Sequence, residues 1–366
     1  MGSVNVELPA GLKQRLTELF PGAAITRVER LGADTTGTGE TEKGLGYGRP
    51  LRVDLRQPDG VERKLVFHLA GADGYGHDRR ADRAAEQLLA WDTFGLFRGH
   101  VRAVDVGAVR ADGGLQSLAG AGEFYLVTEW GEGEVYAEDL RRIARTGVAE
   151  PLDLERLDAL VAALVELHAQ PGTHPGAYVR AWRDLVGSGE GIAGLVDGYR
   201  ADVPQAPAAR LAAIEHQCLS WRQRHKGRVE RLKRTHGDYH PFNLVFAPGS
   251  RVPVLLDTSR GSQGEPADDV ACLAINFLFF GVEHRERWSG GLGELWRRYW
   301  KGYLARGDAG VLECAAPFLA WRALVLCNPE WYPKLPAPER DRLLRLVERA
   351  LAAERFDPTW GEEAMR

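Results

Sequence analysis

Three oxygen-bearing side chains stand at fixed spacings within residues 235–269. Asn243 follows Asp238 after five residues, and Asp257 comes fourteen residues later. An apolar run separates Asn243 from Asp257, which predicts two short strands joined by a turn at Pro248-Gly249. One carboxylate can orient an attacking hydroxyl, while an amide and a second carboxylate can hold Mg²⁺ against a triphosphate. The residue types and their spacing therefore indicate phosphoryl transfer.

The sequence before this stretch predicts a small region rich in strands. Apolar or alternating runs predict strands at 25–31, 51–55, 64–70, 101–109 and 124–129. Helical spacing predicts helices at 8–20 and 79–97. The segment 32–49 holds six glycines and joins the first two strands. Such a loop can place backbone N–H groups over a phosphate, or it can be a plain surface connection.

After residue 130 the pattern becomes helical, apart from the hairpin between Asn243 and Asp257. Helices are expected at 154–168, 192–199, 208–223, 270–280, 293–304, 311–327 and 338–354. We expect an α+β protein with an N-terminal lobe, 1–130, built on a small antiparallel sheet with one helix. The second lobe, 131–366, is expected to be larger and mainly helical.

Composition excludes several classes of function. The 366 residues carry a formal net charge of −4, which supplies no attraction for nucleic acid or an anionic membrane. The sequence contains no apolar run long enough to span a bilayer and no signal peptide pattern at its start. The four cysteines are scattered and form no metal-binding or disulfide pattern. We expect a cytoplasmic protein with reduced thiols.

The run His236-Gly237-Asp238, with Asn243 after it, resembles the catalytic loop of a known family. This is the aminoglycoside phosphotransferase and choline kinase family, whose members are small-molecule kinases with a bilobal protein-kinase-like fold. The resemblance implies ATP and Mg²⁺ as cofactors. It also implies that Asp238 is the catalytic base, in a loop with His236, and that Asn243 and Asp257 hold the metal.

The same resemblance implies roles for residues of the first lobe and for the end of the stretch. Residues 124–130 would form the hinge against which adenine stacks, with backbone groups of Glu129 and Gly131 within reach. Glu86 would be the helix glutamate that pairs with a strand lysine. Asp268 and Asp269 match the place of an aspartate at a helix start, where a carboxylate can brace the catalytic loop.

The family pattern is broken at two places. The position that the family fills with a strand lysine is occupied here by His68. Histidine lacks the reach and the permanent charge of lysine. His68 can stand in for lysine, or another cation takes the role, with Lys64, Arg79, Arg80 and Arg83 as candidates. A third alternative is that nucleotide binding is weak or lost. Arg260 follows the metal aspartate and can hold an anion or form a surface ion pair. His240, inside the loop, can contact substrate or form a hydrogen bond within the loop.

The leading hypothesis is therefore an ATP- and Mg²⁺-dependent phosphotransferase that acts on a hydroxyl of a small molecule. Two alternatives stay open, a kinase-like binding protein without catalysis and an enzyme that transfers a nucleotidyl group. Residues 279–366 hold 14 Arg or Lys and 13 Asp or Glu, a balance that disfavours a polycationic acceptor. Aromatic residues in this region can stack on an acceptor or belong to the core. Acceptor identity and oligomeric state are left open.

Overall fold

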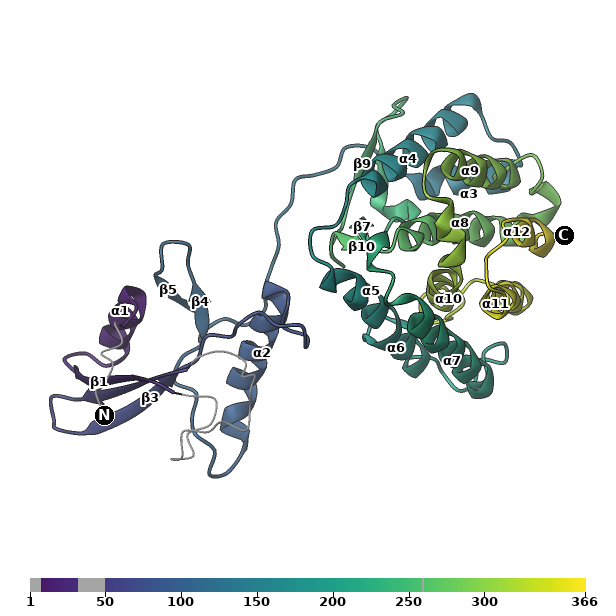
Figure 1. Cartoon of the computed structure of the whole chain (residues 1–366). Coiled ribbons are helices and arrows are strands. Elements are labelled where there is room, and N and C mark those ends of the chain that lie inside the picture. The colour runs from purple at the N-terminus through teal and green to yellow at the C-terminus, as the bar shows by residue number, and fades with distance from the viewer. Residues whose placement is uncertain (1–7, 32–49, 259) are drawn as a thin grey trace. The chain divides into compact units, whose positions relative to one another are not determined.

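The computed structural model describes residues 8–31, 50–258 and 260–366. The chain forms two compact units, Met1–Val127 and Thr128–Arg366. Figure 1 shows the sheet of the first unit and the helices of the second. The glycine-rich segment 32–49, for which a phosphate-binding role was considered, lies outside the described residues. The expected α+β class, with a small antiparallel sheet early in the chain and mainly helices after it, is confirmed.

The first unit is built on a three-stranded antiparallel sheet. Its strands are β1 (Ala24–Arg30), β2 (Leu51–Arg56) and β3 (Glu62–Phe67), in this order. Helix α1 (Ala10–Leu19) packs Leu12 and Leu16 against Val53 and Leu55 of β2. Because side chains alternate along a strand, Lys64 of β3 points to the other face of the sheet. The core of this unit therefore lies on one face of its sheet.

Two predicted strands of the first unit are wrong. The range 101–109 holds only the short strand β4 (Gly107–Val109), which pairs with β5 (Leu115–Ser117). Residues 124–129 form no strand, and Tyr125 and Leu126 are 90% and 87% exposed. Their apolar pattern satisfies the rule for a strand, but no described segment pairs with their backbone. The unit also contains α2 (Arg80–Thr93) and the 3₁₀ turn η1 (Phe94–Leu96).

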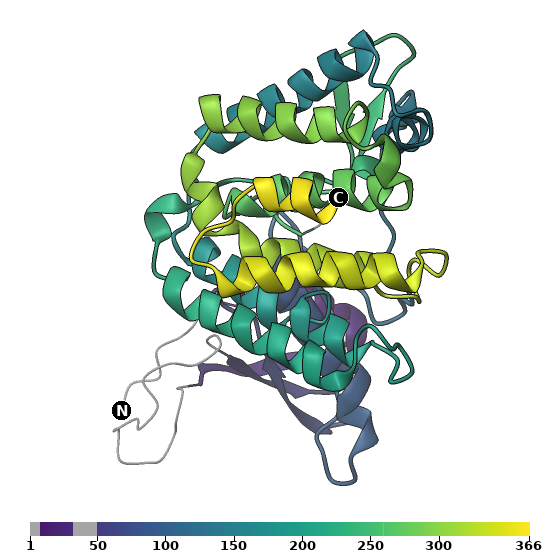
Figure 2. The same ribbon diagram turned by 90° about the vertical axis from the view of Figure 1, so that its right-hand side faces the viewer.

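The second unit is a helical assembly around α8 (Ala267–Gly281), which is buried along most of its length. Helices α9 and α10 pack on α8, α11 packs on α10 and α7, and α4 lies along α9 (Figure 2). These and the other helices are α3 (Tyr136–Thr146), α4 (Pro151–Ala169), α5 (Gly176–Gly187), α6 (Ile192–Asp197), α7 (Ala208–His225), α9 (Leu292–Arg306), α10 (Ala315–Leu326), α11 (Ala337–Ala352) and α12 (Thr359–Ala364). None of the helices within the described ranges combines the length and apolarity that crossing a bilayer requires.

Short strands of the second unit hold the segment with the candidate residues. The hairpin expected from the sequence is present as β8 (Leu244–Phe246) and β9 (Pro253–Leu255), and β6 (Glu134–Val135) pairs with β8. Before and after the hairpin, β7 (Lys233–Arg234) pairs with β10 (Gln263–Gly264). Two pairs of hydrogen-bonded strands, β7–β10 and β8–β9, therefore bound both the loop 235–243 and the segment 256–262.

The aromatic residues near the C-terminus are mostly core. Trp296, Tyr299 and Trp300 of α9 are at most 3% exposed and pack in the main hydrophobic cluster. Trp288 and Trp321 are also buried, whereas Trp331 is 65% exposed. The ring of Tyr299 packs on Phe277 of α8, whereas Trp300 packs on Trp296 and on Phe356. The buried rings are therefore unavailable to stack on an acceptor.

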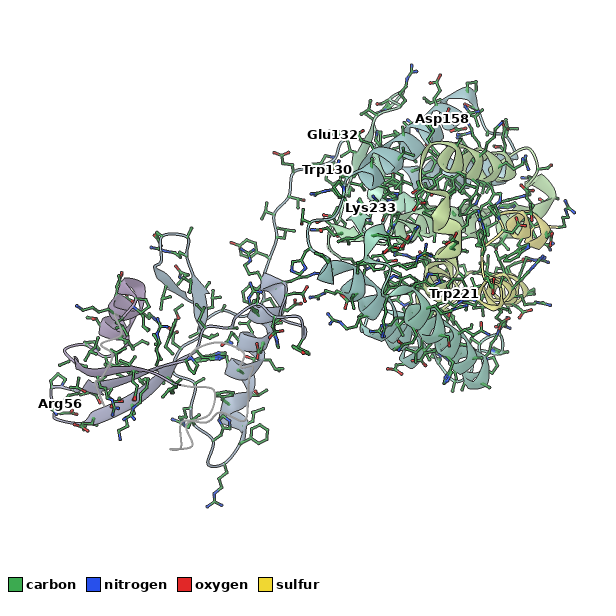
Figure 3. The ribbon with its side chains drawn as sticks, viewed as in Figure 1. Arg56, Trp130, Glu132, Asp158, Trp221 and Lys233 are labelled. Atoms are coloured by element: carbon green, nitrogen blue, oxygen red, sulfur yellow. The ribbon has the colours of Figure 1, made fainter. Side chains whose placement is uncertain are left out.

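A histidine lies stacked between two buried tryptophans at the end of α7. His225 has its ring centroid 5.6 Å from that of Trp182 and 5.2 Å from that of Trp221, with nearly parallel planes. Trp221 is labelled in Figure 3. Burial, together with the nearby Arg228 and Arg224, lowers the pKa of His225 from 6.5 to about 4. The folded protein therefore holds this imidazole neutral at pH values where an unfolded chain protonates it.

This histidine predicts a loss of stability in mild acid. Between pH 6.5 and 4 the unfolded chain binds the proton and the folded chain does not, so the free energy of unfolding falls with falling pH. We expect a loss of about 1 kcal/mol from this group, after allowing for its partial exposure to solvent. Urea unfolding at several pH values, compared with His225→Phe, measures it. Equal pH slopes for the two proteins would contradict the prediction.

Candidate active site

The loop that carries Asp238 is held by backbone hydrogen bonds to the start of α8. The N–H groups of His236 and Gly237 donate to the two carboxylate oxygens of Asp269, at 2.7 and 2.8 Å. Gly237 has a φ of 82°, and a Cβ there would lie 3.1 Å from the carbonyl oxygen of Gly261. The glycine between His236 and Asp238 is therefore required by both the left-handed backbone and the close approach.

Asp269 is itself held by a buried histidine. His168 of α4 has its Nε2 3.1 Å from an oxygen of Asp269, and its Nδ1 lies 2.7 Å from the Tyr303 hydroxyl. Burial alone would raise the pKa of Asp269, but the hydrogen bonds from His168 and from the His236 N–H hold that pKa below its usual range. The bracing carboxylate is therefore charged and fully engaged.

A second buried carboxylate anchors the segment just before α8. Glu265 is fully buried and accepts hydrogen bonds from both Arg231 and the Tyr178 hydroxyl. Arg231, which is 8% exposed, also pairs with Asp308 at 2.8 Å. Burying these charges is tolerated because each has a charged partner and further hydrogen bonds. The network ties α5, the turn before β7 and the start of α8 together.

The two oxygens of the Asp238 carboxylate have different surroundings. Arg322 Nη1 donates to Oδ1 at 2.6 Å, and Arg260 Nη1 lies 2.7 Å from the same oxygen. The other oxygen, Oδ2, lies 3.4 Å from Asn243 Nδ2 and 3.5 Å from His240 Nε2. One oxygen is thus occupied by two guanidinium groups, and the other has only longer contacts within the loop.

His240 meets Asp238 as a neutral ring. Its Nδ1 accepts a hydrogen bond from the Phe242 N–H at 3.1 Å, which assigns the ring proton to Nε2, on the side of Asp238 Oδ2. Burial lowers the pKa of His240, against the opposite influence of Asp238. A contact within the loop, one of the two roles expected for this residue, is thus present.

Asn243 and Asp257 lie at the open end of the β8–β9 hairpin. The Leu256 N–H donates to the Asn243 carbonyl oxygen at 2.9 Å, so Asp257 comes one residue after the partner of Asn243. The side-chain Nδ2 of Asn243 donates to the backbone carbonyl oxygen of Asp238 at 3.1 Å. The side-chain oxygen of Asn243 therefore points away from that carbonyl. Asp257 has a φ of 49°, a left-handed conformation that Asp and Asn tolerate better than most residues.

This donor set fits Mg²⁺ and does not fit a transition metal. Within the described ranges, no three His, Cys, Asp or Glu side chains gather as a metal site. One carboxylate and one amide oxygen are the sparse protein ligands typical of Mg²⁺, which keeps waters and takes phosphate oxygens. The backbone hydrogen bond between Leu256 and Asn243 places Asn243 and Asp257 together at one end of the hairpin.

Three other predicted residues of the second unit occupy different environments. His236 is 2% exposed, and its Nδ1 accepts the Asp238 N–H at 3.3 Å. The side chain of Glu129 is exposed, and the neighbouring Trp130 lies on an extended segment (Figure 3). Gly131 packs against the hairpin, since a Cβ there would lie 3.0 Å from Leu256 Cδ2. Of these, only His236 and Gly131 lie against the Asp238 loop or the β8–β9 hairpin.

In the first unit, the structure does not bring Glu86 to Lys64 or His68. Lys64 pairs across the sheet with Asp54, and His68 is exposed one residue beyond β3. Glu86 of α2 instead faces His77, whose Nε2 lies 3.7 Å from Glu86 Oε2. The other ring nitrogen of His77 lies 3.0 Å from Asp73.

Sequence reasoning missed Arg322, His168 and His77. Arg322 and His168 lie 84 and 101 residues from their partners Asp238 and Asp269. Nothing in the local pattern marks such long-range contacts, although an arginine in the apolar run of α10 is unusual and was a usable signal. The candidates Arg79 and Arg80 make no contact with Glu86 within the described part of the chain, and Arg83 donates to the carbonyl oxygens of His77 and Asp78.

A scan of the sequence against protein-family models finds a match. The model of the phosphotransferase enzyme family matches residues 63–308, two thirds of the chain. This range includes the Asp238 loop, the β8–β9 hairpin and Asp269, and it ends before Arg322. A search of curated proteins finds no match.

Solved structures are similar to the chain at low sequence identity. An ethanolamine kinase of Plasmodium vivax is 12% identical, with 92% of this chain and 83% of that chain covered and a TM-score of 0.33. An aminoglycoside phosphotransferase of Streptomyces rimosus is 18% identical, with 86% and 98% covered and a TM-score of 0.36. An amicoumacin kinase in complex with AMP-PNP, Ca²⁺ and Ami is 14% identical, with 95% of both chains covered and a TM-score of 0.40. Similarity at this level says nothing about the acceptor of this chain.

The predicted family is confirmed by the family match alone. It spans more than half of the sequence and contains each residue of the motif that suggested the family, from His236 to Asp257. The chain belongs to the phosphotransferase enzyme family.

Proposed function

We propose that this protein transfers the γ-phosphoryl group of ATP to a hydroxyl of a small molecule, with Asp238 as the base. The observation that carries the proposal is the asymmetry of the Asp238 carboxylate. Its Oδ1 is engaged by two guanidinium groups, while Oδ2 has only contacts of 3.4 and 3.5 Å. A base must have an oxygen within reach of the hydroxyl that it orients, and the long contacts of Oδ2 support it as that oxygen.

The residues around Asp238 are proposed to bind the metal or to orient the base. Asn243 and Asp257 hold Mg²⁺, which when bound neutralises charge on the transferring phosphoryl group. His240, whose Nε2 lies 3.5 Å from Oδ2, helps to orient the base. Arg260 engages Oδ1 and is also paired with Glu190, at 3.1 Å. His236 shapes the loop from a buried position, where its Nδ1 accepts the Asp238 N–H.

The residues proposed to bind the nucleotide follow from the resemblance to the family. By resemblance to the family, the backbone of Glu129 and Gly131 meets adenine, and Glu86 helps to arrange the phosphates. Lys64 and His68 stay candidates for the cation that faces the phosphates. His77, which the structure places opposite Glu86, joins them as a third candidate.

The experiment is a transfer assay with Mg-ATP and a panel of small molecules that carry hydroxyl groups, read by mass spectrometry. A product that gains one phosphoryl group supports the proposal, and a gain of a nucleotidyl group replaces it by nucleotidyl transfer. A panel without any product, together with no thermal shift on adding Mg-ATP, would contradict it. Transfer lost in Asp257→Ala excludes the alternative of a kinase-like binding protein.

The Mg²⁺ role predicts a selective effect of Asp257→Asn. Asparagine tolerates the left-handed backbone at this position and removes only the charge. We expect the Mg²⁺ concentration for half-maximal activity to rise at least about tenfold, because loss of an outer-shell partner alone costs that much. Titration of activity with Mg²⁺ at saturating ATP measures it. Asp202→Asn, in an exposed ion pair with Arg200, is the control and is expected to change nothing.

A further inference from the structure

Arg322 makes three charged or polar contacts from a buried position on α10. It is 7% exposed, and its Nη1 donates to Asp238 Oδ1 at 2.6 Å. Its Nη2 donates to the Gly237 carbonyl oxygen and to Asp268 Oδ1, both at 2.9 Å. The guanidinium lies 3.9 Å from the ring centroid of Trp321. One side chain therefore joins the carboxylate of the proposed base, the backbone beside it and the start of α8.

Trp321 packs against the Arg322 guanidinium. The Trp321 indole N–H donates to the Glu190 carbonyl oxygen at 2.7 Å, which ties the ring to the segment between α5 and α6. The guanidinium lies over this ring, and its planar fork of donors reaches all three acceptors. A lysine in the same place has no planar fork and cannot reach all three acceptors together.

Asp268 and Asp269 contact the Asp238 loop in different ways, Asp269 directly and Asp268 through Arg322. Asp269 accepts the backbone N–H groups of His236 and Gly237 and so fixes the path of the loop. Asp268 makes no contact with Asp238 within the described residues, but it anchors Arg322, which does. Adjacent carboxylates at the start of one helix thus hold the backbone of the loop and, through Arg322, the side chain of Asp238.

We propose that Arg322 is the positioning residue that sets the Asp238 carboxylate with Oδ1 engaged and Oδ2 presented to the acceptor hydroxyl. This inference rests on the proposed function, in which Asp238 is the base, and assigns a residue that lies beyond the matched range 63–308. Arg322 does not act on the substrate. It acts through Asp238, and Asp268 acts through Arg322.

Arg322→Lys tests the proposal, because it keeps the charge and removes the fork. We expect kcat to fall about 100-fold with KM for ATP and for the acceptor unchanged, since a misplaced catalytic group costs this much without loss of binding. A crystal structure of the variant is expected to show Asp238 in a different rotamer. Asp268→Asn keeps an oxygen acceptor for Arg322 but loses its charge, and a smaller fall of roughly tenfold is expected.

Arg340→Lys is the matched control. Arg340 is also a buried arginine of the second unit, and it donates to the carbonyl oxygens of Cys327 and Tyr332. It makes no contact with Asp238 within the described residues. Its replacement is expected to lower the melting temperature and to leave kcat per folded molecule intact. A purely structural role for Arg322 predicts the same result for Arg322→Lys.

The outcomes separate this inference from the proposed function. If the wild-type protein transfers phosphate and folded Arg322→Lys keeps its kcat, the positioning role is overturned and the proposed function stands. If Arg322→Lys does not fold, an unchanged kcat in Asp268→Asn overturns the positioning role instead. If the wild-type protein transfers phosphate to no acceptor, the proposed function fails and the positioning role fails with it.

Discussion

Asp238→Asn is expected to lower kcat for phosphoryl transfer about 1,000-fold, in the range for the loss of a general base. Asparagine keeps the shape of the side chain but cannot accept the proton of the acceptor hydroxyl. It also removes the charge that faces Arg322 and Arg260, both of which contact Oδ1. Initial rates at saturating Mg-ATP and acceptor measure the effect.

Stability must be measured beside activity for this variant. Two guanidinium groups lose their shared carboxylate, so some loss of folding free energy is expected as well. Asp158→Asn is the control, because Asp158 (labelled in Figure 3) is exposed, paired with Arg298 and remote in sequence from the Asp238 loop. A folded Asp238→Asn protein with wild-type kcat would remove Asp238 from the mechanism.

Arg231→Met is expected to lower the free energy of unfolding by about 3 to 5 kcal/mol. The substitution leaves the fully buried Glu265 without its ionic partner, and the Tyr178 hydroxyl and the Ala267 N–H, both neutral donors, still donate to it. A buried charge in this state is strongly destabilising because no water replaces the lost contact. Urea unfolding, followed by circular dichroism, measures the change.

Two further variants show that the effect comes from burial. Arg298→Met breaks the pair with Asp158, whose side chains are 44% and 46% exposed, and is expected to cost less than about 1 kcal/mol. Adding Glu265→Leu to Arg231→Met removes the orphaned charge and is expected to restore part of the stability. Equal losses for Arg231→Met and Arg298→Met would mean that the Arg231–Glu265 pair is not buried as described.

Local patterns predicted much of the fold correctly. Helical spacing predicted α4, α7, α8, α9 and α11 to within a few residues, and alternation predicted β1, β2 and β3. Most of these elements carry their own signal, because apolar side chains recur along them and pack in a hydrophobic core. Strand β1 is the exception, since it is mostly exposed. The prediction failed at 124–129, where an apolar run met every local rule for a strand. Whether such a run becomes a strand depends on a pairing partner, which no local rule can supply.

In the candidate site, too, the residues close together in sequence could be predicted, and the long-range contacts could not. His236, Asp238, Asn243 and Asp257 could be found from the sequence, because one loop and one hairpin hold them at fixed spacings. The pairing of Glu86 with His77 in place of Lys64 or His68 could not be found. The position of a residue in a strand or helix predicts which way its side chain points. It does not predict which side chain from a loop will lie against it, as His77 does against Glu86.

By itself, the sequence determined the family, the α+β class and the short-range motif that we propose for chemistry. Those features depend on neighbours in the chain, whose geometry is set by backbone spacing. Only the tertiary structure decided that Oδ1 of Asp238 is engaged by Arg322 and Arg260, and that Asp268 stands behind Arg322. It also decided that the tryptophans of α9 are core. The contacts of Arg322 join residues far apart in the chain, and they form because helix packing brings α8 and α10 together.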